Sequence, residues 1–279
     1  MVFLLFSAAA LFVSGIVAVM IYRKPAGAVK IGLIGAVIGS ITGLIPCIQI
    51  LFGRQEQIQV LQWGCFSFCL ERLPAIFLLP LLILIPLCAF HAVNYIKERA
   101  SCFWFFFNLL CTAILLIPLI DFRNSVAFLF CWELMGMSSF ALVLFEYSNH
   151  ETRRASWVYL LSAHAGAMFL IPMFLLLGRG GTDSPGTAMV IFILAVIGFG
   201  LKAGLALLHF WLPPAHAAAP APVSALMSAA MNNMGIYGIL KVAMLTGCLC
   251  IPAGSCCVSD WPDVWGLLFL LWPRNISNA

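Results

Sequence analysis

The sequence predicts an all-α fold: a polytopic membrane helix bundle of about eight transmembrane helices, with a discontinuous seventh helix. Three observations support this prediction. Of the 279 residues, 63% are hydrophobic and only 9% are charged, whereas a soluble domain carries about 25% charged residues. The apolar residues form runs of about 20, the length that a helix needs to cross a bilayer. Four prolines then interrupt one of the most apolar runs, between residues 198 and 233.

Eight apolar runs are long enough to span a bilayer, and short loops separate them. The first is too long and too uniformly apolar for a cleaved signal peptide, so we expect it to remain as a helix. Each of the next five follows a loop that contains lysine or arginine, the seventh follows the loop-like segment GRGGTDSPG, and the eighth follows the prolines. The spans are Val2–Tyr22, Ile31–Phe52, Leu73–Ala92, Cys102–Ile120, Val126–Phe145, Ala155–Leu177, Ala188–Leu212 and Val223–Leu249.

The distribution of basic residues predicts the orientation, because lysine and arginine are enriched in cytoplasmic loops. The loops after the first, third and fifth spans hold Arg23, Lys24, Lys30, Lys97, Arg99, Arg153 and Arg154, against Arg54, Arg72, Arg123 and Arg179 in the loops between them. We therefore expect a multi-pass protein of the inner (cytoplasmic) cell membrane with its N-terminus outside. Since the basic residues are dispersed over loop ends, the net charge of +4 reports topology, and no nucleic-acid surface is predicted.

Glu133, His164 and Lys202 lie deep inside their spans. A charged residue at the bilayer centre costs about 2.5–3.5 kcal/mol on insertion scales, so such groups usually face the bundle interior and have a partner. We therefore expect Glu133 and Lys202 to face one another, directly or through water. Two interpretations are open. In one, the pair is a structural ion pair and His164 is a neutral, hydrogen-bonded imidazole; in the other, the three belong to a proton or ion path.

The prolines predict a break after the seventh span begins. They are Pro213, Pro214, Pro220 and Pro222. They lack a backbone N–H and cannot all continue a helix, and non-helical backbone at membrane depth survives only when it is buried in protein or lines a hydrated cavity. We expect a missing backbone hydrogen bond between residues 203 and 212, with Gly204 as the hinge because it has no β-carbon. His209 and His216 flank the break, and either line the path or lie at the headgroup level.

The sequence resembles a known family in two stretches: FCWELMGMSSFALVLF, from residue 130, and GFGLKAGLALLHFWLPPAHAAAPAPVSALMSAAM, from residue 198. Both look like the antiporter-like membrane subunits shared by complex I, the Mrp cation/proton antiporters and the energy-converting hydrogenases, including formate hydrogenlyase. The likeness covers about residues 70–241. The stretch around WELM and the SAHAG of the following span resemble the hydrogenase-type and Mrp-type members most.

The resemblance implies roles for particular residues. Glu133 matches the fifth-helix glutamate of the half-channel through which protons enter, and Lys202 matches the lysine of the family's discontinuous seventh helix. In the family, the glutamate modulates the proton affinity of that lysine, so a movement of one relative to the other would act as a switch. Further matches are the family's histidines, at His209 and His216, and its helix-breaking prolines, at Pro213 and Pro220.

The sequence departs from the family at two points. Asn233 stands where a lysine or histidine is normal on the eighth helix, and an amide cannot hold a transferable proton. Lys241, about two turns further on, either takes that role or snorkels to the interface. Family members usually have about fourteen helices in two inverted repeats, whereas we expect three N-terminal helices (1–98), the first repeat (99–249) and a loop with an incomplete ninth helix (250–279). This pattern suggests a truncated or frameshifted product, or one piece of a split subunit.

Three functions compete. The first is a proton-translocating, antiporter-like membrane subunit, or a truncated form of one, in a membrane-bound hydrogenase or NADH:quinone oxidoreductase-type complex. The second is an Mrp-type sodium/proton antiporter subunit, and the third is a non-functional structural membrane fragment. The expected partners are sister membrane subunits, a peripheral redox arm, the lipid bilayer and protons, with sodium as the alternative ion. The sequence has no motif for a nucleotide, flavin, metal or iron–sulfur cluster, so no cofactor is predicted, redox chemistry belongs to partners, and an enzymatic role of the chain itself is left open.

Overall fold

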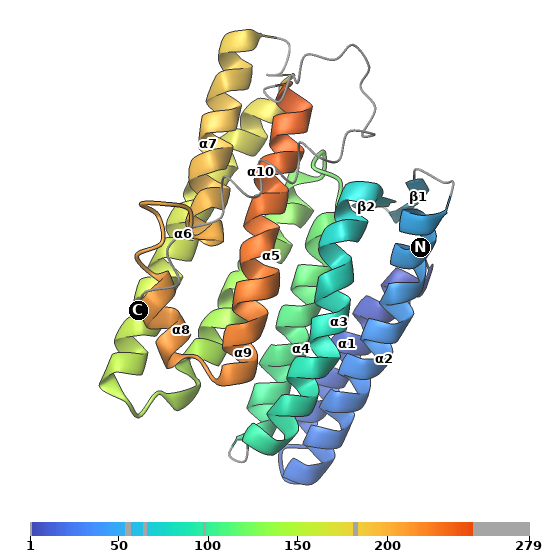
Figure 1. The fold of residues 1–279 in the computed structure, drawn as a ribbon, viewed down its shortest axis with the longest axis vertical. Helices are drawn as coiled ribbons and strands as arrows, with labels where there is room; N and C mark the ends of the chain where they lie inside the picture. The colour runs from blue at the N-terminus through green and yellow to red at the C-terminus, as the bar shows by residue number, and fades with distance from the viewer. Residues whose placement is uncertain (1, 54–56, 64–65, 97–98, 181–183, 248–279) are drawn as a thin grey trace.

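The structure, a computed structural model, describes residues 2–53, 57–63, 66–96, 99–180 and 184–247. They form an elongated bundle in which long helices run side by side (Figure 1). Seven of the described helices are long and apolar enough to cross a membrane, which confirms the polytopic membrane helix bundle. The helices are α1 (Val2–Met20), α2 (Pro25–Phe52), α3 (Arg72–Tyr95), α4 (Ala100–Leu116), α5 (Ser125–Val143), α6 (His150–Gly178), α7 (Pro185–Ala203), α8 (Leu212–Ala218), α9 (Ala221–Leu226) and α10 (Asn232–Thr246).

The first helices pack closely because α2 carries a stripe of buried glycines. A β-carbon at Gly35 would run into the side chain of Ser14 on α1, and one at Gly32 would run into the ring of Trp104 on α4. Small residues at such positions let helix backbones approach one another inside a membrane. The absence of side chains on this face of α2 therefore determines how α1, α2 and α4 fit together.

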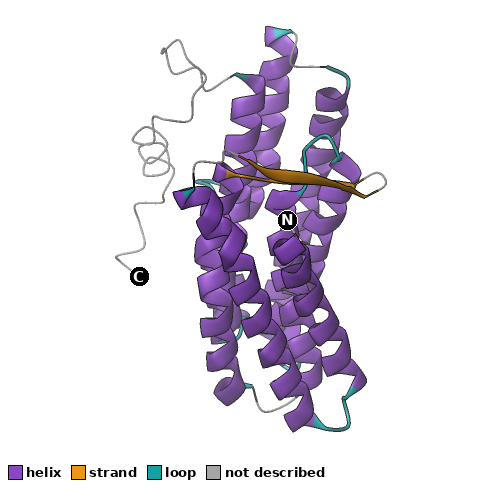
Figure 2. Ribbon diagram, turned by 90° about the vertical axis from the view of Figure 1, so that its right-hand side faces the viewer, coloured by secondary structure: helices purple, strands orange, loops and turns teal. Residues whose placement is uncertain are grey.

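A short β-hairpin connects α2 to α3, where the sequence analysis had predicted only helices. Strand β1 (Gln57–Trp63) pairs antiparallel with β2 (Phe66–Glu71), and Figure 2 shows the strands lying across the direction of the helices. Both strands are rich in aromatic and aliphatic residues alternating with polar ones, a pattern that favours β structure. Phe68 forms an isolated antiparallel bridge with Ile120, in the connection between α4 and α5. The hairpin thus contacts the rest of the bundle at the end where α5 begins.

The predicted eighth span is a helical stretch from Ala221 to Thr246 rather than one regular α-helix. α9 leads into a π-helical turn, Met227–Met231, and α10 follows directly. This division explains why seven long helices are found where eight spans were expected: neither piece alone has the length of a span. The last predicted residues of this span, and the predicted loop and incomplete ninth helix at 250–279, lie outside the described residues.

Candidate functional site around Lys202

The helix that carries Lys202 ends one residue after it. α7 stops at Ala203, and Gly204 takes the left-handed conformation with φ 68° and ψ 41°. The Leu205 N–H then closes back on the carbonyl of Gly200 at 3.1 Å, a helix ending that glycine permits because it has no β-carbon. The regular helical pattern is therefore interrupted before residue 205, and the predicted span Ala188–Leu212 is not one continuous helix.

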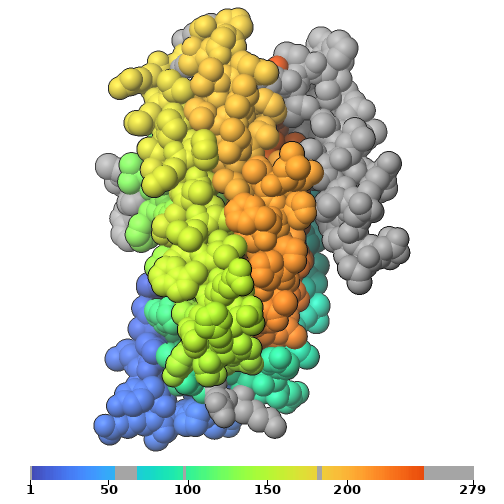
Figure 3. Space-filling model, turned by 90° about the vertical axis from the view of Figure 1, so that its left-hand side faces the viewer, coloured from blue at the N-terminus to red at the C-terminus, as the bar shows by residue number. Residues whose placement is uncertain are grey.

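The segment between α7 and α8 is irregular but attached to the helix that it leaves. The indole N–H of the buried Trp211 donates to the Leu201 carbonyl at 2.6 Å, supplying a partner for one of the carbonyls left free at the end of α7. Leu207 has a φ of 74° and is 92% exposed. Figure 3 shows the orange segment that follows α7 beside α6 on one face of the molecule. The non-helical backbone between α7 and α8 thus begins two residues after Lys202.

Lys202 is buried, with 3% of its surface exposed. Its ammonium donates a hydrogen bond to the hydroxyl of Tyr159 on α6 at 2.6 Å, and lies 4.7 Å from the centre of the same ring. On its other side lies α5, because a β-carbon at Gly136 would be 3.8 Å from the Lys202 Nζ. The side chain therefore projects from the end of α7 into the space between α5 and α6.

Tyr159 connects Lys202 to a second hydroxyl. Its oxygen makes a very short hydrogen bond to Ser139 Oγ on α5, and its hydroxyl can also donate to the sulfur of Met231 at 3.5 Å. Ser139 in turn donates to the Met135 carbonyl at 2.6 Å, with the Gly136 carbonyl at 3.0 Å. Tyr159 and Ser139 are completely buried. Lys202, Tyr159 and Ser139 thus form a polar chain across three helices.

Glu133 and His164 form a separate pair. The His164 Nδ1 lies 3.5 Å from a Glu133 carboxylate oxygen, and the two side chains are 48% and 39% exposed. Within the described residues no ion pair joins Glu133 to Lys202, although Glu133 lies on α5 one turn before Gly136, which faces the Lys202 ammonium. The static Glu133–Lys202 ion pair that was one interpretation of the sequence is therefore not formed, and the carboxylate is paired with the histidine instead.

Among the described residues, Lys202 forms its hydrogen bond with Tyr159 and none with the other predicted site residues. His209 is exposed, and His216 makes a hydrogen bond of 2.8 Å to Ser224 Oγ. Asn233 donates to the Ala229 carbonyl, in the π-helical turn before α10, at 2.7 Å. The prolines belong to the helices that follow the break: Pro213 and Pro214 lie in the first turn of α8, Pro220 precedes α9, and Pro222 is its second residue.

Lys241 does not extend freely to the interface. Its Nζ lies 2.5 Å from Oε2 of Glu71, the last residue of the hairpin, and the side chains are only 19% and 34% exposed. Burial raises the pKa of the nearby Cys69 thiol in β2, and the charge of Glu71 raises it further. The ion pair of Lys241 and Glu71 connects α10 to the hairpin, between residues 170 positions apart in the sequence.

An aromatic cluster lies between Lys202 and this ion pair. The ring of Phe199, one turn before Lys202, is 5.1 Å from the Trp132 ring and 5.9 Å from the Phe128 ring, centre to centre. A β-carbon at Gly238, one turn before Lys241, would collide with Phe199. Tyr237 extends the cluster, and its hydroxyl donates to the Pro118 carbonyl at 3.3 Å. The two charged sites on α7 and α10 are therefore separated by buried rings.

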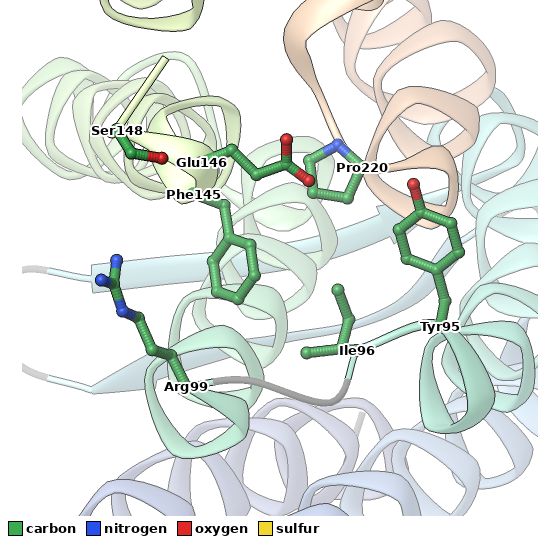
Figure 4. Close-up of a pocket in the computed structure, with 7 residues that line it drawn as sticks. All are labelled: Tyr95, Ile96, Arg99, Phe145, Glu146, Ser148 and Pro220. Carbon is green, nitrogen blue, oxygen red and sulfur yellow. The ribbon is translucent and has the colours of Figure 1, made fainter.

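A cavity of about 250 Å³ opens at the other end of the bundle. Figure 4 shows the Arg99 and Glu146 side chains among those that line it, with Pro220 from the connection between α8 and α9. Arg99 has a left-handed backbone, and its guanidinium donates to the Tyr147 hydroxyl at 2.7 Å. The lining does not include Lys202. Its residues are Tyr95, Ile96, Arg99, Phe145, Glu146, Ser148 and Pro220.

Four residues of the site were missed in the sequence analysis: Tyr159, Ser139, Trp211 and Glu71. A signal existed for the two aromatic residues, because tyrosine and tryptophan inside an apolar span need a hydrogen-bond partner when buried. Ser139 gave no such signal, since a serine in a membrane helix commonly bonds to its own backbone. The partner of Lys241 depends on a hairpin that had not been predicted.

A comparison with known proteins finds a match to a protein family in the second half of the chain. Residues 123–251 match the family described as "NADH:quinone oxidoreductase/Mrp antiporter, TM". The chain is 37% identical over 190 residues to "Hydrogenase-4 component B" of Escherichia coli (strain K12), covering 63% of this chain and 28% of that protein. It is 27% identical over 178 residues to "F(420)H(2) dehydrogenase subunit N" of Methanosarcina mazei, covering 58% of this chain and 35% of that protein.

A solved structure shares the fold. A chain of the membrane-bound sulfane sulfur reductase, an archaeal respiratory membrane complex, superposes with a TM-score of 0.72 at 24% identity, covering 90% of this chain and 42% of that one. The resemblance to antiporter-like membrane subunits is thus confirmed. The chain spans less than half the length of these relatives.

Proposed function

We propose that this chain provides a proton-translocating element in which Lys202 binds and releases the proton, because residues 123–251 match the family described as "NADH:quinone oxidoreductase/Mrp antiporter, TM". The chain would act as an antiporter-like membrane subunit, or part of one, in a hydrogenase-type or NADH:quinone oxidoreductase-type complex. Its partners would be sister membrane subunits and a peripheral redox arm. In this proposal residues 99–249 form the antiporter-like repeat, in an inner membrane with the N-terminus outside.

One observation carries the proposal: Lys202 is buried at the end of an interrupted helix, and its hydrogen-bond partner is a hydroxyl rather than a carboxylate. Burial disfavours a charged lysine, whereas a nearby carboxylate favours it. Since Glu133 acts on Lys202 from a distance and without a fixed ion pair, a small movement of α5 or α7 changes the balance between these effects. A tightly paired lysine would respond much less.

His164 gives the proposed element a second control. A protonated His164 neutralises the Glu133 carboxylate that it faces at 3.5 Å, and a neutral one leaves the full negative charge to act on Lys202. Both side chains are partly exposed at the surface of the bundle, and in this scheme they exchange protons from that side. In this scheme, proton exchange at Glu133 and His164 sets the charge that Lys202 experiences.

Replacing Lys202 tests the proposal. In the assembled complex, reconstituted in lipid vesicles, Lys202→Met should abolish proton uptake while the complex still assembles, because the substitution removes a buried charge instead of adding one. Lys30→Met is the matched control, since Lys30 is exposed in the first turns of α2, and it should transport protons at the wild-type rate. Normal proton uptake by the Lys202→Met complex would contradict the proposal.

The same vesicles distinguish protons from sodium as the transported ion. A proton-translocating subunit should work unchanged in sodium-free buffer. An Mrp-type sodium/proton antiporter subunit would require sodium and would exchange radioactive sodium for protons across the membrane. Both sodium transport and proton transport should then be lost in Lys202→Met. Sodium-dependent uptake that survives in Lys202→Met would place the ion path elsewhere in the chain.

A further inference from the structure

The hydroxyls of Tyr159, on α6, and Ser139, on α5, connect Lys202 by hydrogen bonds to the helix that carries Glu133. We infer that they form a hydrogen-bond chain that reverses its direction when Lys202 gains or loses its proton, and that thereby transmits the charge of Lys202 to α5. Tyr159 is then a positioning residue for Lys202. The inference rests on the proposed role of Lys202 as the group that binds the proton.

The direction of the chain is determined when Lys202 is charged. An ammonium has three donors and no acceptor, so the Tyr159 oxygen must accept its hydrogen bond at 2.6 Å. The tyrosine hydrogen is then free to point to Ser139 Oγ, and the serine hydrogen points on to the Met135 carbonyl at 2.6 Å. Every hydrogen in this state points away from the lysine and toward the backbone of α5.

The direction changes when Lys202 is neutral. A neutral amine has a lone pair that accepts strongly, whereas its N–H groups are weak donors, so the acidic phenol hydrogen turns toward the Lys202 nitrogen. The Tyr159 oxygen then accepts from Ser139 Oγ, and the serine hydrogen leaves the Met135 carbonyl. No covalent bond changes in this step, because each hydrogen stays on its own oxygen and only the hydroxyl torsions rotate. Met231 Sδ, at 3.5 Å, is a weak acceptor and competes poorly with either partner.

Because the hydroxyl chain is buried, a change in its direction at Lys202 must extend to its other end. Ser139 and Tyr159 have no exposed surface and Lys202 has 3%, so bulk solvent cannot replace a missing partner, and unpaired polar groups are costly there. The far end of the chain is the turn Met135–Gly136 of α5, which begins two residues after Glu133. Protonation of Lys202 is thus transmitted by hydrogen bonds to the turn next to the carboxylate that acts on it.

Three variants of the assembled complex test this inference through its pH dependence. Tyr159→Phe removes the acceptor of the ammonium and should slow proton uptake by about tenfold to a hundredfold, the equivalent of one hydrogen bond to a charged group. Because the charged lysine loses a partner, the optimum should move to more acidic pH. Ser139→Ala should produce a smaller change in the same direction, and Ser139→Thr, which keeps the hydroxyl, should restore the wild-type profile.

Tyr237→Phe is the matched control. Tyr237 is equally buried and also makes one hydrogen bond, to the Pro118 carbonyl, but it does not contact Lys202. Its removal should leave the pH profile unchanged. A Tyr159→Phe complex that transports protons with the wild-type rate and pH profile would overturn the inference, as would a Tyr237→Phe complex whose profile shifts equally.

An infrared measurement decides the matter without a Tyr159 variant, should that variant fail to assemble. The C–O stretching band of a tyrosine differs between a hydroxyl that donates and one that accepts. In the wild-type complex, labelled on the tyrosine ring, one band should change with pH, and Lys202→Met should abolish the change. A pH-independent band in a complex whose proton uptake depends on Lys202 would refute the hydroxyl chain but leave the proposed function intact. Normal uptake by Lys202→Met would refute the proposed function itself.

Discussion

Replacing Gly235 with alanine would place a methyl group where α10 touches the end of α7. The new β-carbon would lie 2.7 Å from the Phe199 carbonyl oxygen, 2.8 Å from the Ala203 backbone nitrogen and 2.9 Å from the Ala203 β-carbon. All three distances are shorter than van der Waals contact, and two of the atoms belong to backbone that cannot turn aside. The helices must therefore separate at the position where α7 ends beside Lys202.

The cost of that separation follows from the atoms that the new methyl group would meet. Inserting a methyl group into a packed core costs about 1–3 kcal/mol, and we expect Gly235→Ala to be in the upper part of this range because the neighbours are backbone atoms. Thermal unfolding of the purified protein in detergent should show a clear drop in melting temperature. Proton uptake should fall as well, because the end of α7 positions the Lys202 side chain between α5 and α6.

Gly178→Ala is the control for this experiment. A β-carbon at Gly178, the last residue of α6, would meet no atom within 4 Å, so alanine should leave the stability unchanged or raise it by up to about 1 kcal/mol through its higher helix propensity. If Gly235→Ala unfolds at the same temperature as Gly178→Ala, the close approach of α10 to α7 is not present in the protein, and the reasoning fails.

Two further experiments probe the contact of α10 with the hairpin and the end of α7. In a double-mutant cycle of Glu71→Gln and Lys241→Met, the free energy of unfolding should show a coupling of about 1 kcal/mol, the upper value for pairs near a surface. The value is high because both side chains are partly buried. Additive effects of the two substitutions would argue against the ion pair. Gly204→Ala should destabilise the protein by about 1–2 kcal/mol, because φ is 68° there. Gly204→Asn should cost less, because asparagine tolerates this conformation. Equal melting temperatures for the two variants would contradict the left-handed end of α7 at Gly204.

The bundle could be predicted from the sequence because apolar length alone defines a transmembrane helix. The positions of the helices followed from runs of about 20 apolar residues, and the interruption after Lys202 followed from prolines and a glycine that regular helices disfavour. The hairpin was missed because a span analysis treats everything between two apolar runs as a loop. Its strands read QIQVLQW and FSFCLE, so an alternating pattern was present in that loop.

The candidate site could be predicted in its charges but not in its hydrogen bonds. Lys202 and Glu133 stood out because charge is costly in an apolar span. Their partners did not, because the hydroxyl of Tyr159 and the imidazole of His164 reach them across helix interfaces whose rotation the sequence leaves open. Glycines decide those interfaces here: Gly166 of α6 lies against the Gly198 carbonyl of α7. Such contacts depend on how two helices meet, which a pattern along one helix does not describe.

The hydrogen bond between Lys202 and Tyr159 also bears on how the protein is made. A lysine in a membrane segment is costly during insertion, by up to about 2.5–3.5 kcal/mol at the centre of the bilayer, and Lys202 adds such a cost to the insertion of α7. Its hydroxyl partner lies on α6, the helix synthesised immediately before it. α7 can therefore enter the bilayer already docked to α6, so that a helical pair, rather than a single helix, is the unit that the insertion machinery releases into lipid.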